Sequence, residues 1–509
     1  MIKFVIRVSS ELGVKSPAVR KRWTTFLSQN IRKLARQICP KAKVRQEWDG
    51  LELVVNQYED KQFDKLKQQL QELLARTPGI AHFSFAKEGH FSTKKDLVQL
   101  CIDHYQHLVS PSQSFAVRVR RKGVHDFKSP EIESAVGAGL LERCPGLHVK
   151  LKSPDHLIQI DLNDQNLDLL EAKQLGLGGF PIGTQGSALM LMSGGFDSTA
   201  AAYHAMRRGL KVHFVYFDMG APEQTLIVKS IAEQLWQRYG ASHPVRIITV
   251  PWHALMADIA ANSRPSTAGV VLKRLMLQAA SKVAKKAKAE ALITGEAVSQ
   301  VASQTLPNLS LIDKAAELPV FRPLIFTDKH TIIDQVRKLG LEPLCVGIKE
   351  VCGSVSIKPS AQVDASLLAA DESRLTQGLL QAALTAGEVL SIDRLHTASE
   401  KKNTTAQPSI DTKLEAPDVI IDIRHPDEIA DRPFPFRDRF ANIPVEPIPF
   451  YQLLEASEHF ERSKQYALYC KEGSMSRLQA RHLRNQGFSN IQALADGSEA
   501  HNEIVNHSP

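Results

Sequence analysis

The first ninety residues alternate between strand-like and helix-like patterns of apolar and polar positions. Residues 2–9 alternate apolar and polar side chains, as expected of a half-buried strand. The stretch from Pro17 to Ile38 places seven apolar residues on one helical face: Val19, Trp23, Phe26, Leu27, Ile31, Leu34 and Ile38. Two strands joined by the turn signal Asp49-Gly50, then a helix and a strand, follow at residues 43–48, 51–56, 60–76 and 80–86. This β-α-β-β-α-β order predicts a ferredoxin-like α+β domain.

A second α+β pattern covers residues 91–165, and its most distinctive part is a strand that runs into a basic loop. Within residues 115–129 six side chains are basic or can become so: Arg118, Arg120, Arg121, Lys122, His125 and Lys128. A glycine-containing helix is predicted at 131–142. This arrangement resembles the THUMP domain, and the resemblance implies that the six residues contact RNA. A solvated basic hairpin is the alternative.

Strands and helices alternate strictly after a turn-rich boundary around Gly176 and Gly183. We expect strands at residues 188–192, 211–217, 245–250 and 291–294. We expect helices between them at 198–208, 222–239 and 270–288. This alternation predicts a doubly wound parallel sheet, whose ligands lie beyond the carboxyl ends of the strands.

The last part of the chain combines a helix-rich piece, a polar linker and a small α/β domain. Residues 396–416 have linker composition, and a buried strand is predicted to start at 417. A second strand at 466–470 is followed by a short loop and a helix at 477–487. The domains expected along the chain are 1–61 (or 1–90, if the helix and strand that follow belong to the first domain), 62–167, 168–390, a linker at 391–416, and 417–509.

Charge is concentrated in the first third of the chain. The net charge is +8, and residues 1–180 account for all of it, with 28 Lys and Arg against 20 Asp and Glu. A positive field at one end of the chain favours a polyanionic partner such as RNA, although a merely solvated face explains the excess equally well. Binding to a membrane surface is a weaker alternative.

Several classes of protein are disfavoured. No apolar run approaches the ~20 residues that span a bilayer, and the N-terminus lacks a signal-peptide core, so we expect a cytoplasmic protein with no membrane partner. The six cysteines include no CxxC pair, which argues against a disulfide scaffold or a cysteine-rich zinc site. Cys345 has apolar neighbours and is predicted to lie in the core.

The first chemical motif directly follows the predicted strand at 188–192. It consists of Ser193, Gly194, Gly195, Phe196, Asp197 and Ser198, and a helix is predicted to begin there. Glycines allow a tight turn that exposes backbone N–H groups, serine hydroxyls add donors, and the helix N-terminus favours an anion. The motif therefore predicts a pyrophosphate cradle, and the lack of a following Gly-Lys-Ser/Thr excludes a Walker A loop.

This motif resembles that of the PP-loop ATP pyrophosphatases, which cleave ATP to AMP and pyrophosphate. The resemblance implies that Leu191, Met192 and the motif residues contact ATP, and that Asp197 also helps to hold Mg²⁺. It further implies nucleotide contacts from Lys273, Gly295 and Gln304, and a catalytic role for Lys329.

The second chemical motif is Cys470, which ends a predicted strand and heads the loop CKEGSM. Backbone N–H groups of such a loop and the N-terminus of the next helix stabilise a thiolate or a persulfide. The loop and the strand at 420–424 resemble those of a rhodanese-like domain, which implies that Cys470 carries sulfur. A structural cysteine is the alternative.

The order of these four parts resembles the bacterial tRNA sulfurtransferase (4-thiouridine synthase) family over nearly the whole chain. The resemblance implies ATP-dependent adenylation of C4 of a tRNA uridine, at position 8 in the family. Persulfide sulfur carried on Cys470 then replaces the oxygen, and a Cys352–Cys470 disulfide forms in turnover. It also implies tRNA, a cysteine desulfurase, a thiol reductant and the sulfur-carrier protein of thiazole synthesis as partners, and a possible homodimer.

Two other functions remain open at this point. A PP-loop enzyme could adenylate tRNA for a nucleophile other than sulfur. Alternatively, the chain could be a non-enzymatic, RNA-binding sulfur carrier with an inactive nucleotide site.

Overall fold

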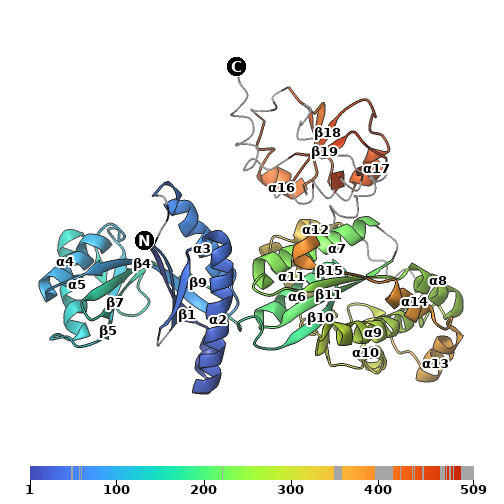
Figure 1. Cartoon of the computed structure of the whole chain (residues 1–509), viewed down its shortest axis with the longest axis horizontal. Coiled ribbons are helices and arrows are strands. Elements are labelled where there is room, and N and C mark those ends of the chain that lie inside the picture. The colour runs from blue at the N-terminus through green and yellow to red at the C-terminus, as the bar shows by residue number, and fades with distance from the viewer. Residues whose placement is uncertain are drawn as a thin grey trace. The chain divides into compact units, whose positions relative to one another are not determined.

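A computed structural model describes residues 1–348 except 48–49, 57, 59 and 220–221, residues 358–395, and residues 417–494 except 425, 438–439, 441, 450–451, 471–475, 477–478, 481–482 and 485–486. These residues form a mixed α/β protein with three sheets, in agreement with the predicted fold class (Figure 1). Residues 1–186, with short segments at 205–211 and 238–243, make one compact unit, and the remaining residues make a second.

The N-terminal elements follow the predicted β-α-β-β-α-β order. They are β1 (Ile2–Val8), α1 (Ser10–Gly13), α2 (Pro17–Ile38), β2 (Lys43–Glu47), β3 (Gly50–Val55), α3 (Phe63–Arg76) and β4 (Ile80–His90), and the strand order is β2-β3-β1-β4. Alternate residues of β1, among them Phe4, are buried against α2 and α3 (Figure 1). Leu66, Leu70 and Leu74 of α3 recur every four residues and enter the same core.

Strand β4 continues past its predicted end at residue 86 and joins a second set of strands. That set contains β5 (Ser114–Lys122), β6 (His148–Val149), β7 (His156–Asn163), β8 (Asn166–Leu170) and β9 (Gln174–Leu175), with the helices α4 (Lys94–Tyr105) and α5 (Ser129–Arg143). Residues 80–85 of β4 pair with β1, whereas 86–90 pair with β8. The two halves of this unit therefore share one nine-stranded sheet.

A buried lysine joins the two halves through its side chain. The Nζ atom of Lys3 lies 2.8 Å from Asp168 on β8, 2.9 Å from Glu88 on β4 and 3.2 Å from Glu52 on β3. Burial acts to lower the pKa of Lys3, but hydrogen bonding to Asp168 and the carboxylate charges raise it overall. Burial raises the pKa of Asp168 to about 6 in spite of its bond to Lys3. The carboxylates around it thus keep Lys3 charged, whereas burial dominates the shift of Asp168.

Replacing Lys3 by methionine should destabilise the fold by about 3 kcal/mol at pH 7, because the carboxylates lose their counter-charge. This loss of stability is the low end of the range for breaking a buried ion pair. We choose the low end because the Glu88 side chain is 46% exposed, so solvent screens its charge. Urea unfolding would measure the change. Without Lys3 the pKa of Asp168 would rise further above its value of about 6, and protonation would then remove the unpaired charge, so the deficit should shrink as the pH falls from neutral towards about 6. Lys285→Met, which removes an exposed ion pair with Glu317, is the control and should have little effect.

The central domain contains a six-stranded sheet in the order β14-β13-β10-β11-β12-β15. Its strands are β10 (Ser187–Leu191), β11 (Lys211–Asp218), β12 (Arg246–Pro251), β13 (Ala291–Ile293), β14 (Val320–Phe321) and β15 (Glu388–Ser391). Its helices are α6 (Phe196–Arg207), α7 (Pro222–Leu235, continued by a π turn at Trp236–Gly240), α8 (His253–Asn262), α9 (Ala268–Ala287), α10 (Leu306–Asp313), α11 (Lys329–Lys338), α12 (Glu342–Val346), α13 (Ala365–Arg374) and α14 (Leu379–Thr385). Every strand and helix predicted between 188 and 294 is present.

This sheet is mixed, whereas the sequence predicts a purely parallel one. Strands β10 and β13, β11 and β12, and β13 and β14 pair in parallel, but β15 is antiparallel to β12. A short connection from α14 brings β15 to the edge of the sheet, where it covers otherwise unpaired backbone groups. Ile392, in the expected linker, is fully buried next to this strand.

The C-terminal residues form a small sheet of four strands. They are β16 (Val419–Asp422), β17 (Val445–Pro447), β18 (Tyr466–Tyr469) and β19 (Ile491–Ala493), in the order β17-β16-β18-β19, and all three neighbouring pairs are parallel. The described helices here are α16 (Pro426–Asp431) and α17 (Leu453–Ser457). Across the described parts of the whole chain, no helix combines the length and apolarity needed to cross a bilayer.

Candidate active site

The glycine-rich motif forms a closed loop between β10 and α6. The Oγ atom of Ser198 accepts hydrogen bonds from the backbone N–H groups of Ser193 (3.3 Å) and Gly194 (3.2 Å), and it donates to the carbonyl of Gly195 (3.1 Å). Gly194 has φ +84°, and a Cβ there would lie 2.8 Å from Val228. The loop therefore needs both its glycine and its serine hydroxyls to keep this shape.

The sheet order brings a second segment against this loop. Strands β10 and β13 are neighbours although a hundred residues separate them, so their carboxyl ends open at the same edge. Gly295 follows β13, and a Cβ at this position would lie 2.6 Å from both the carbonyl carbon of Asp197 and the backbone nitrogen of Ser198. Only glycine fits this contact without displacing the loop.

Asp197 is held by two side chains from distant parts of the sequence. The Nζ atom of Lys329, at the start of α11, lies 2.7 and 2.9 Å from the two carboxylate oxygens. Gln300 donates to one of these oxygens at 3.0 Å. The Asp197 side chain is 25% exposed and that of Lys329 is 44% exposed. The pair is thus accessible to a charged ligand at the open edge of the sheet.

The remaining residues predicted to contact the nucleotide lie around the same edge. Leu191 ends β10, and the buried Met192 bonds through its backbone to Val215 on β11. Lys273 of α9 is paired with Glu296, the neighbour of Gly295, at 2.8 Å. The Oε1 atom of Gln304 is buried and has no hydrogen-bond partner among the described residues. An acceptor left unpaired in this way is suited to a donor group on a ligand.

Cys470 lies directly after β18, at the carboxyl edge of the C-terminal sheet. It is 8% exposed, and its Sγ atom accepts a hydrogen bond from the backbone N–H of Ser476 at 3.3 Å. The hydroxyl of Ser476 lies 3.6 Å from the same sulfur. The guanidinium of Arg424, paired with Asp422, lies over the ring of Tyr469, the residue before Cys470. The sulfur of Cys470 thus accepts one backbone N–H and lies within hydrogen-bonding distance of the Ser476 hydroxyl.

The other cysteines differ from Cys470. Cys345 is buried in the core, as predicted, and burial raises its pKa to about 12. The predicted disulfide partner, Cys352, lies outside the described residues, as does the loop 471–475.

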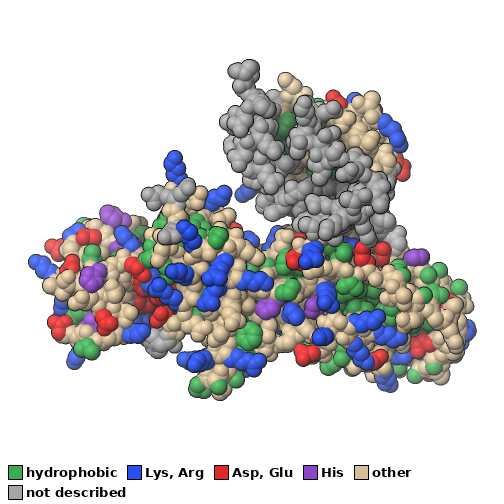
Figure 2. All heavy atoms as spheres, viewed as in Figure 1, with side chains coloured by type: hydrophobic (Ala, Val, Ile, Leu, Met, Phe, Trp, Pro, Cys, Tyr) green, Lys and Arg blue, Asp and Glu red, His purple; other side chains and the backbone are tan. Residues whose placement is uncertain are grey.

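The six basic residues predicted to contact RNA are on β5 and in the loop that follows. Four of them are exposed: Arg120, Arg121, Lys122 and Lys128. Arg118 and His125 are half-buried and bond to backbone carbonyls of Leu151 (3.3 Å) and Asp164 (2.9 Å). Further exposed cations lie along α2, where Figure 2 shows Lys and Arg side chains: Arg20, Lys21, Arg22, Lys33 and Arg36. The basic excess of the sequence is therefore on the surface of the first unit.

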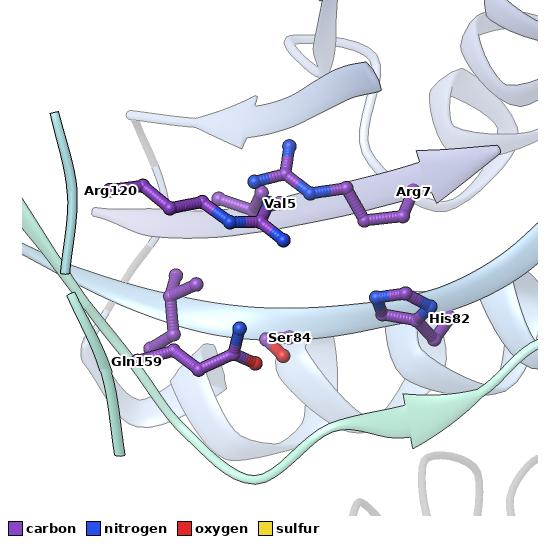
Figure 3. Close-up of a pocket in the computed structure, with 7 residues that line it drawn as sticks. Val5, Arg7, His82, Ser84, Arg120 and Gln159 are labelled. Atoms are coloured by element: carbon purple, nitrogen blue, oxygen red, sulfur yellow. The ribbon is translucent and has the colours of Figure 1, made fainter. Parts of the chain in front are cut away.

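A small pocket in the nine-stranded sheet is lined in part by Arg120, one of these six residues. Its lining includes the cationic groups of Arg7 and Arg120, with His82 and Gln159 nearby (Figure 3). Burial, with the charges of Lys173, Arg7 and Arg120, lowers the pKa of His82 to about 4, so this imidazole is neutral at pH 7.

Comparison with known proteins identifies the family. The model of the family described as thiamine biosynthesis protein (ThiI) matches residues 183–376, and the THUMP domain model matches 92–169. The tRNA sulfurtransferase of Saccharophagus degradans is 42% identical over 96% of this chain and 99% of its own length, and that of Pseudomonas putida is 38% identical over the same shares. The chain belongs to the tRNA sulfurtransferase family. It is therefore an enzyme that transfers sulfur, as predicted, and not a non-enzymatic carrier.

A solved structure supports the same assignment. A 4-thiouridine synthetase, crystallised as an RNA complex with bound ATP, superposes with a TM-score of 0.66 at 25% identity, covering 77% of this chain and 99% of the other. The THUMP model match confirms the family predicted for the second domain.

Three polar residues near this candidate nucleotide site were not found from the sequence. They are Glu296, Gln300 and Arg322. The first two lie within five residues of Gly295. Their closeness in sequence to this predicted nucleotide contact could have marked them as candidates. Nothing in the local pattern distinguishes Arg322.

Proposed function

We propose that the chain adenylates C4 of a uridine in tRNA with ATP and replaces the oxygen with sulfur carried on Cys470, giving 4-thiouridine. The contact of Gly295 with the loop that holds Asp197 and Ser198 carries this proposal, because it builds one anion cradle from two strand ends. The bound ATP and RNA of the related 4-thiouridine synthetase support the choice of substrates.

In the first step the uridine O4 attacks the α-phosphate of ATP, and pyrophosphate leaves. Backbone N–H groups of the loop and the ammonium of Lys329 would stabilise the charge that develops on the phosphates. Mg²⁺ would arrive with ATP and take Asp197 as a ligand. The described residues contain no group of three or more acidic, histidine or cysteine side chains suited to a metal, so phosphates and water would complete its shell.

In the second step the terminal sulfur of a Cys470 persulfide attacks C4, and AMP leaves. Cys352 then attacks the Sγ atom of Cys470. This step releases the thiolated base and leaves a Cys352–Cys470 disulfide, which a thiol reductant reopens. The backbone N–H of Ser476 donates a hydrogen bond to the sulfur of Cys470. A donor at this position stabilises a thiolate or persulfide and so supports the role of Cys470 as a sulfur carrier. We further propose that a cysteine desulfurase loads Cys470, and that this C-terminal domain is rhodanese-like and also supplies sulfur to the carrier protein of thiazole synthesis.

The test is a reaction of the full chain with ATP, tRNA and a persulfide donor, followed by mass spectrometry of the tRNA nucleosides. We expect 4-thiouridine together with AMP and pyrophosphate. Release of AMP and pyrophosphate without thiolated uridine would instead indicate a nucleophile other than sulfur. Absence of all three products would refute the proposal.

Cys352→Ser should separate single from repeated turnover. We expect this variant to accept a persulfide on Cys470 but to form no more than about one equivalent of product. Without Cys352 the thiolated base stays joined to Cys470 by a disulfide, so the enzyme cannot start another cycle. Product counted per enzyme over time measures this effect. Undiminished repeated turnover would contradict the disulfide step.

A further inference from the structure

Glu296 is a buried carboxylate with partners on three elements. It is 8% exposed, and one of its oxygens accepts from the Nζ atom of Lys273 on α9 at 2.8 Å. The other oxygen accepts from the Nε atom of Arg322, just after β14, at 2.8 Å and from the hydroxyl of Thr294 at 3.0 Å. Both oxygens are therefore fixed in place.

Arg322 is itself held from its other side. Its two terminal nitrogens lie 2.6 and 3.1 Å from the carboxylate of Asp313 on α10. The pKa of Glu296 reflects this environment: burial alone would raise it, but the charges of Lys273 and Arg322 keep it below the usual value. Glu296 is thus a carboxylate that stays ionised at neutral pH.

This chain of contacts ends at the nucleotide site. Glu296 directly follows Gly295, which touches the loop at Asp197 and Ser198. A lysine side chain has four flexible bonds, and fixing its ammonium on a rigid carboxylate removes most of that freedom. The ammonium carries three donors, and Glu296 accepts one of them.

We propose that Glu296 is a positioning residue that holds the ammonium of Lys273 toward the nucleotide, and that Arg322 fixes Glu296 for this task. The inference rests on the proposed function, because Lys273 is assigned there to ATP. An ammonium held in place before binding loses little conformational entropy when ATP binds. Positioning of Lys273 by Glu296 should therefore increase the affinity for ATP.

Glu296→Gln keeps the shape of the side chain but removes its charge. We expect the KM for ATP to rise about tenfold, with kcat and the KM for tRNA nearly unchanged, because uniform binding of the nucleotide is weakened. Steady-state release of AMP and pyrophosphate measures all three parameters. Thermal unfolding of the same variant reports on folding.

A double-mutant cycle separates positioning from a structural role. If Glu296 acts through Lys273, then Glu296→Gln should add nothing to the ATP KM of Lys273→Met. Glu372→Gln is the matched control, because Glu372 pairs at similar burial with Arg274, the next residue of α9. Its ATP KM should equal that of the wild type.

Two outcomes would overturn the inference. One is a folded Glu296→Gln with an unchanged ATP KM, and the other is additivity with Lys273→Met. Should Glu296→Gln not fold, Thr294→Val removes one hydrogen bond to Glu296 and should raise the ATP KM about two- to threefold; an unchanged value would overturn the inference as well. A wild type that releases no AMP would instead reject the proposed function itself.

Discussion

Replacing Cys470 by serine is expected to abolish 4-thiouridine formation and the AMP release that depends on sulfur attack, while tRNA-dependent release of pyrophosphate in the adenylation step is retained. A serine hydroxyl has nearly the size of the thiol and can still accept from the backbone N–H of Ser476, but it cannot carry a persulfide sulfur. The nucleotide site lies on another sheet and keeps all of its residues. Mass spectrometry of nucleosides and a pyrophosphate assay on the same sample would show the two effects together.

Cys144→Ser is the control for this experiment. Cys144 is half-buried, and its thiol lies 3.7 Å from the carbonyl of Gln106, an interaction that a hydroxyl can replace. Thiolation should therefore continue at the wild-type rate. If Cys470→Ser still produced 4-thiouridine, sulfur would have to reach the base by a route that does not involve this residue.

Gly295→Ala is expected to lower ATP-dependent activity by on the order of 10²-fold, since misplacing catalytic groups by about 1 Å has effects of that size. The added Cβ would lie 2.6 Å from the peptide that joins Asp197 and Ser198, so the loop must move away from β13. Both the anion cradle and the bond from Lys329 to Asp197 would be disturbed. Rates of pyrophosphate release at saturating ATP would measure the loss.

The same substitution at Gly137 provides the comparison. Gly137 is in α5, and a Cβ at this position meets no atom within 4 Å outside its own helix. Alanine favours helix, so Gly137→Ala should leave activity unchanged and stabilise the protein by about 0.5–1 kcal/mol. Wild-type activity in Gly295→Ala would mean that the loop does not need its close contact with β13.

Much of the geometry of the proposed nucleotide site could be predicted because its main motif is local. Ser193, Gly194 and Ser198 lie within six residues, and strand, turn and helix follow one another as the apolar pattern indicates. The hydrogen bonds that the Ser198 hydroxyl accepts, and that close the loop, span at most five residues. Such short-range features are set by backbone preference and therefore can be read from a sequence.

The residues that complete the site do not follow from the local pattern: Gln300 was not predicted, and Lys329 was expected only from the family resemblance. Gln300 and Lys329 reach Asp197 from 103 and 132 positions further along the chain. Lys3 forms ion pairs with carboxylates on β3, β4 and β8, yet in the sequence it is only one polar position of an alternating strand. The antiparallel direction of β15 also depends on its pairing with β12, which lies far away in the sequence.

The amino-acid sequence determined the order of strands and helices, the position of the glycine-rich motif and of Cys470, and the excess of basic residues in the first unit. Each of these depends on neighbouring residues or on periodicity, which the chain carries before it folds. The tertiary structure alone decided that Gly295 touches the loop of Asp197, that Glu296 fixes Lys273, and that two halves of the first unit share strand β4. These contacts arise only when distant strands become neighbours in a sheet, and burial then selects the charge pairs that can persist there.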